Sequence, residues 1–180
     1  LDRKFFGFGL RWNMRHAHQA DIDRVCRVLE LLQAEYSNTG PPKMGHQALM
    51  MYLPDADHPD GQIPCLSLRG LYDGTRQEAQ AALGPLLATL EDPKADVEIW
   101  TDKHHYTRLN EMLLQTVTPP GLDMPNVSMN TKPLVEGWLI NDHHSATRWH
   151  DVVDHFLNAP DKTCFVAVEF YGGKIAEPKP

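Results

Sequence analysis

Residues 5–15 read FFGFGLRWNMR, and this stretch decides the fold class. From Phe6 to Met14 every second residue is apolar, and the residues between them are glycine, arginine and asparagine. This strict alternation predicts a β-strand with one apolar face and one less apolar face. A strand of this kind needs a cover on one side only, which is typical of an antiparallel sheet with helices on a single face.

The next elements continue the alternation between strand and helix. Residues 21–36 carry apolar side chains at helical spacing, and Asp21 is expected to be the N-cap of that helix. Two apolar runs of strand length follow at 47–53 and 63–72, and a further strand is expected at 96–101. These elements together predict a sheet of at least four strands.

Helical signals separate the later strands. Thr75 and Glu78 have the spacing of a capping box, so a second helix begins there, and Pro85 is expected to kink it. A short helix is expected at about 106–115, then a long amphipathic helix that includes 149–157, and a last strand at 163–171. The predicted fold class is α+β in a single domain over residues 1–180, with the ferredoxin-like order β-α-β-β-α-β followed by an extra helix and strand.

Charge and composition exclude several classes of function. The 180-residue chain has 17 Lys and Arg against 24 Asp and Glu, a net charge of −7, so no nucleic-acid partner is expected. No apolar run approaches the ~20 residues that span a bilayer, so no membrane partner is expected either. The 3 cysteines are far apart and sit among apolar neighbours, which indicates buried thiols rather than a disulfide framework.

The common catalytic and binding motifs are missing. The chain has 10 histidines, but none falls in a His-Glu-x-x-His pattern and no acidic cluster completes a ligand set, so no metal site is predicted. Neither a dinucleotide-binding glycine motif at a helix start nor a phosphate-binding loop is present. The sequence therefore predicts no nucleotide site of standard type.

The less apolar face of the sheet is the most informative feature. Strand alternation gathers polar and aromatic residues from the first, third and last strands on it: Arg11, Asn13, Ser67, Arg69, Glu169 and Tyr171. Such a face is either the floor of a ligand site or a solvent-exposed surface, and periodicity alone favours the solvent-exposed surface.

Several segments follow one another in an order known from one enzyme family. The segments are Leu68–Leu87, Val97–Trp100, Lys132–Leu134, Trp149–Phe156 and Phe165–Ile175, the last containing Glu-Phe-Tyr-Gly-Gly. Their order over nearly the whole chain resembles the substrate domain of the berberine bridge enzyme-like FAD-linked oxidases. The resemblance implies a part of an FAD-dependent oxidoreductase that oxidises an alcohol, a sugar or an amine-like carbon of a small-molecule substrate by hydride transfer to flavin.

The same resemblance implies which residues contact the substrate. Glu169 lies at a strand position from which family members present a polar side chain, Tyr171 shares its face, and Arg69 and Arg11 are weaker candidates from alternation. The usual catalytic base lies beyond the Gly-Gly turn, so no catalytic residue is assigned. The family's FAD-binding domain has no counterpart here, and none of the present His or Cys is assigned as a flavin tether.

Because the FAD-binding domain and the usual base of the family have no counterpart here, two expectations and two alternatives follow. The chain is expected to be a truncated or split piece that is inactive alone and does not retain FAD without the missing domain. It is also expected to dimerise or aggregate through its orphaned sheet face. The alternatives are a stand-alone ferredoxin-like binding module that dimerises through its sheet and a small metal-dependent enzyme that uses the histidines.

Overall fold

The computed structural model describes residues 4–15, 18–36, 43–57, 61–92, 97–109, 146–160, 162 and 165–168. The elements within these ranges are β1 (Lys4–Asn13), α1 (Gln19–Glu35), β2 (Met44–Pro54), β3 (Gln62–Tyr72), α2 (Arg76–Ala82), α3 (Gly84–Leu87), β4 (Val97–His105), α5 (Ala146–Leu157) and β5 (Val166–Val168).

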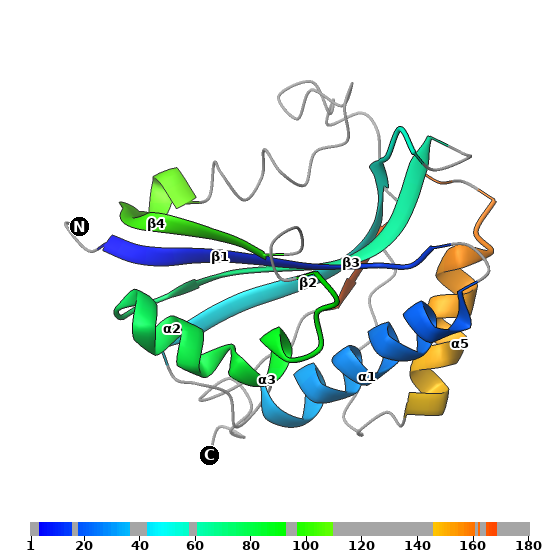
Figure 1. Ribbon diagram of the computed structural model, residues 1–180, viewed down its shortest axis with the longest axis horizontal. Coiled ribbons are helices and arrows are strands. Elements are labelled where there is room, and N and C mark those ends of the chain that lie inside the picture. Colours follow the sequence, from blue (N-terminus) through cyan, green and yellow to red (C-terminus); the bar gives the residue numbers. More distant parts are fainter. Residues whose placement is uncertain are drawn as a thin grey trace, which may run out of the picture.

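One five-stranded sheet, in the order β4-β1-β3-β2-β5, organises the molecule, and every neighbouring pair is antiparallel. Helix α1 connects β1 to β2, yet β3 lies between these two strands (Figure 1). Because β1 and β2 are both antiparallel to β3, they run parallel to each other, which is the split β-α-β arrangement. The predicted α+β fold with an antiparallel sheet is confirmed.

The four labelled helices lie on one side of the sheet (Figure 1). The alternating side chains of β1 predicted to be apolar, from Phe6 to Met14, are all at most 2% exposed. Most of them join β2, β3, α1 and α5 in one core, to which Val25, Leu29 and Phe156 contribute. Burying one such side chain contributes roughly 1.5–3 kcal/mol, so this face supplies most of the hydrophobic stabilisation.

The helix boundaries confirm some of the predictions and correct one. Thr75 and Glu78 form both hydrogen bonds of a capping box at the start of α2. The expected kink at Pro85 is a break, because α2 ends at Ala82 and α3 begins at Gly84 with the proline in its first turn. Asp21 is not an N-cap: His18 holds that position without a side-chain cap bond, and Asp21 lies inside the first turn, where two arginines bind it.

None of the helices in the described part of the chain is long and apolar enough to cross a membrane.

Candidate substrate-binding face

The sheet face opposite the helices carries the predicted polar residues of β1 and β3 side by side. Arg11 of β1 pairs with Ser67 of β3, and Asn13 pairs with Cys65. Arg69 pairs with Gly9, which has no side chain, so Arg11 is its diagonal neighbour on the same face. The structure therefore brings together both predicted arginines, and we call Arg11, Asn13, Ser67 and Arg69 the polar patch.

Hydrogen bonding within the polar patch is incomplete. The Arg69 Nε donates to the Ser67 Oγ over 3.2 Å, and Ser67 is only 3% exposed. The Arg11 Nε and the Asn13 Oδ1 are shielded from solvent, and neither has a hydrogen-bond partner in the described part of the chain. Buried polar atoms are nearly always paired, so two such atoms on one face leave room for a partner there, although the Arg24 Nε in another part of the chain is in the same condition.

The centre of this face is buried, which corrects the expectation of a simple solvent-exposed surface. Leu49 and Met51 of β2 and Cys65 of β3 form a second apolar cluster, and Leu53 packs against it. The three clustered side chains are at most 6% exposed. Alternation along a strand predicts which face a side chain points to, but it does not predict what covers that face in the folded chain.

The Cys65 thiol lies in this cluster and is expected to be unreactive near neutral pH. Burial raises its pKa to about 12, and the positive charges of Arg11 and Arg69 offset only part of that effect. Cys26, in the core under α1, behaves in the same way: burial, with a smaller effect of Asp23, raises its pKa to about 12. Both thiols are neutral near pH 7, so neither offers the thiolate that nucleophilic catalysis requires.

The remaining two predicted site residues are outside the described residues. Glu169 and Tyr171 follow β5, which is described from Val166 to Val168. Ala167 pairs with Leu49, and Leu49 pairs with Ser67, so β5 reaches the row of the sheet that contains Arg11. The roles of Glu169 and Tyr171 stay predictions.

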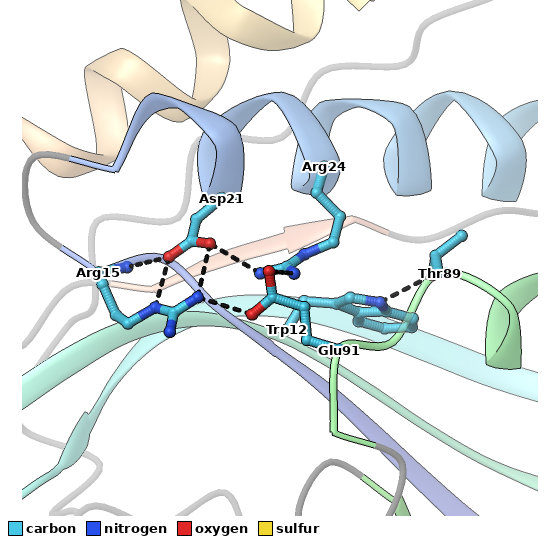
Figure 2. Close-up of polar contacts among 6 residues, drawn as sticks. All are labelled: Trp12, Arg15, Asp21, Arg24, Thr89 and Glu91. Atoms are coloured by element: carbon cyan, nitrogen blue, oxygen red, sulfur yellow. Dashed lines mark hydrogen bonds and ion pairs between the residues drawn. The ribbon is translucent and has the colours of Figure 1, made fainter.

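A charged cluster that the sequence analysis missed lies on the helix side of the sheet (Figure 2). Asp21 of α1 is 2% exposed and accepts hydrogen bonds from the backbone N–H of Arg15 (3.0 Å), from the Arg15 guanidinium (2.8 and 2.9 Å) and from Arg24 Nη2 (2.9 Å). Glu91, after α3, also pairs with Arg15, at 2.7 Å, and with Arg24.

The protonation state of Asp21 follows from these contacts. Burial by itself raises the pKa of the carboxyl group, but the hydrogen bonds and charge of Arg15 and the charge of Arg24 lower it below its ordinary value. Asp21 is therefore ionised near neutral pH, and the cluster carries no net charge. Its four members hold the end of β1, the start of α1 and the segment after α3 together, which is a structural role.

One further hydrogen bond ties the same elements together. The indole Nε1 of Trp12 donates to the Thr89 Oγ1 over 2.9 Å, and the Thr89 hydroxyl donates to the backbone oxygen of Leu86 over 2.7 Å (Figure 2). Trp12 is thus a core residue, as predicted. The sequence carries no signal for its partner, because Thr89 lies far along the chain and in no motif.

The histidines within the described ranges do not converge. No group of three or more His, Cys, Asp or Glu side chains in that part of the chain is arranged to hold a metal ion. His150 of α5 lies 3.3 Å from a carboxylate oxygen of Asp23, which is a contact between two helices. The pKa of His46 is lowered by burial, so this side chain is neutral at pH 7.

The start of α2 does not fit the diphosphate of a dinucleotide. Phosphates bind helix N-termini through free N–H groups and a positive partial charge. The first turn of α1 contains Asp21, and the first turn of α2 contains Glu78, whose carboxylate already accepts from the backbone N–H of Thr75 at 2.7 Å. The start of α2 therefore repels a second anion, whereas the charge of Asp21 in α1 is already balanced by Arg15 and Arg24.

Comparisons with known proteins found no similar protein, so the function is argued from the geometry. The sequence matches no protein-family model, and neither the curated proteins nor the solved structures give a match.

Proposed function

We propose that this chain is the substrate-binding domain of an FAD-dependent oxidoreductase that oxidises an alcohol, a sugar or an amine-like carbon. The observation that carries the proposal is the polar patch: a sheet face that leaves a buried donor on Arg11 and a buried acceptor on Asn13 unpaired in the described part of the chain. Unpaired buried polar atoms destabilise the fold, and a ligand that hydrogen-bonds to them removes this penalty. On a sheet face open to solvent, water would supply these hydrogen bonds instead.

A separate domain holds the flavin in this proposal. The N-terminus of α2 is occupied by the Glu78 carboxylate and does not fit its diphosphate. The chain described here contributes a wall with hydrogen-bonding groups that orient the substrate, and Glu169 and Tyr171 stay predicted substrate contacts. No catalytic base is assigned among Arg11, Ser67 and Arg69, because arginine stays protonated and Ser67 already accepts a hydrogen bond from Arg69.

The alternative of a binding module that dimerises through this face receives less support. A dimer interface needs exposed apolar area that becomes buried on association. Leu49, Met51 and Cys65 are already buried within the single chain, so this part of the face offers little such area. Light scattering over a concentration series tests the alternative directly, since it requires a concentration-dependent dimer.

A flavin-retention measurement tests the division between domains. The purified chain is mixed with FAD and desalted, and its visible absorbance is recorded before and after. The proposal expects no retained flavin spectrum. A retained spectrum contradicts the proposal, because the chain then holds the cofactor by itself.

A ligand titration tests the substrate role. Amide chemical shifts of the isotope-labelled chain are followed by NMR during addition of small-molecule probes. Benzyl alcohol represents the alcohols, D-glucose the sugars and benzylamine the amines, and D-glucuronate is added as a sugar acid. The proposal expects at least one probe to shift the amides of Arg11, Ser67 and Arg69. If the folded chain responds to none of the probes at these amides, a substrate-binding role for this face is contradicted.

A further inference from the structure

Arg11 sits at the polar patch, and none of the ion pairs between described residues includes it. Its Nε is shielded from solvent and lacks a hydrogen-bond partner in the described part of the chain. The residue as a whole is of intermediate exposure, so it is not fully enclosed. An arginine in this condition is matched best by an anion.

A second arginine is oriented toward the same place. Arg69 is the diagonal neighbour of Arg11 across the β1–β3 pair, which puts their Cβ atoms roughly 7–8 Å apart. The hydrogen bond from its Nε to Ser67 restrains the guanidinium. Gly9, opposite Arg69, leaves the space between the two long side chains free of a third one.

The surroundings strengthen an electrostatic contact at this point. Leu49 pairs with Ser67, Cys65 precedes Ser67 by two residues on the same face, and both are buried, so water is excluded beside the patch and charge interactions are less screened. The positive charges of Arg11 and Arg69 both act on the Cys65 thiol, which shows that their fields overlap there. Glu98 of β4 pairs with Gly9 on the side away from Arg69.

We propose that Arg11 and Arg69 bind the carboxylate of an acidic substrate, while the Asn13 Oδ1 accepts a hydrogen bond from a hydroxyl group of the same molecule. This assignment rests on the proposed function and narrows it from alcohols, sugars and amines to hydroxy acids such as sugar acids. The two arginines supply the charge-assisted donors, and Asn13 supplies the acceptor that tells a hydroxy acid from a simple anion.

A pair of matched probes tests the assignment. D-glucuronate and D-glucose share the same ring, and only glucuronate carries a carboxylate. Titrations monitored by NMR are expected to give glucuronate a dissociation constant about tenfold or more below that of glucose, with shifts at the amides of Arg11, Ser67 and Arg69. Acetate at the same ionic strength is expected to bind more weakly than glucuronate, because it lacks a hydroxyl group for Asn13.

Charge-removing variants locate the effect. Arg11→Gln and Arg69→Gln are each expected to weaken glucuronate binding by about tenfold and to leave glucose binding nearly unchanged. Arg148→Gln is the matched control, because it removes the same charge from an exposed position on α5, on the helix side of the sheet. Circular dichroism verifies that each variant is folded, and Arg11→Lys replaces Arg11→Gln if the latter unfolds, with a smaller loss expected.

The outcomes separate this assignment from the proposed function. If glucose or benzylamine shifts the patch amides as strongly as glucuronate does, the acidic substrate is wrong and the substrate-binding role survives. Equal weakening by Arg148→Gln also overturns the assignment, because the binding then depends on net charge alone. A retained flavin spectrum contradicts the division between domains and leaves the carboxylate site standing.

Discussion

At the scale of single residues, Asp21 shows how a buried charge is kept. Its carboxylate is 2% exposed and is held by Arg15 and Arg24, so removal of its charge leaves two cations without their principal partner. Asp21→Asn is expected to lower the free energy of unfolding by about 2 kcal/mol, less than for a fully buried pair because Arg15 is half-exposed. Urea denaturation measures it, and Asp151→Asn, at an exposed position on α5, is the control that should change stability by less than about 0.5 kcal/mol.

The pH dependence of stability follows from the same carboxyl group. The pKa of this carboxyl group is lower in the folded chain than the ordinary value of 3.8. Its contribution to the free energy of unfolding is therefore fully present above that value and is lost as pH falls through the folded pKa. The difference in unfolding free energy between the unmodified chain and Asp21→Asn is therefore expected to be constant above about pH 5 and to shrink toward pH 2. A difference that stays constant across this range contradicts the ionised, ion-paired assignment.

The two buried thiols give a prediction that needs no mutation. Burial raises the pKa of both Cys26 and Cys65 to about 12, so neither forms the reactive thiolate near pH 8 in the folded chain. A disulfide reagent such as DTNB is expected to leave both residues unmodified in native buffer and to label them in urea, as read by peptide mass mapping. Rapid native labelling of Cys65 would show that the sheet face opposite the helices is open.

At the scale of elements, the start of α2 is the clearest case of local sequence deciding local structure. The Thr75 Oγ1 accepts from the backbone N–H of Glu78 at 3.2 Å, and Glu78 accepts in return from the backbone of Thr75. Thr75→Ala is expected to cost about 1 kcal/mol of unfolding free energy because it removes the cap. Gln80→Ala, exposed in the same helix, is the control and should be neutral or slightly stabilising.

The other predicted elements divide according to how far their signals extend along the chain. The strand at the start and the helix that follows it were predictable, because alternation and helical spacing act over a few residues. Pro85 predicted only a kink, where the structure has a break between α2 and α3. The start of α1 was placed wrongly at Asp21. A carboxylate near a helix start is normally a cap, and here Arg15 and Arg24 bind it instead.

At the scale of the whole molecule, the strand order predicts where the chain opens last. Strands β1 and β3 are interior in the sheet and pair on both sides, whereas β4 and β5 lie at its edges. Native-state hydrogen exchange is expected to be slowest in β1 and β3, which share the core, and faster in β4. Equal protection of β4 would indicate that another element or chain covers this edge.

The sequence by itself determined the fold class and the side of each strand that carries its polar residues. Arg11 and Arg69 were therefore identifiable as members of one face, since the spacing of side chains along a strand is a local property of the backbone. Only the tertiary structure decided the register that makes them diagonal neighbours, the burial of Leu49, Met51 and Cys65 beside them on the same face, and the cluster around Asp21. These features depend on contacts between residues far apart in the chain, and no short pattern encodes such contacts.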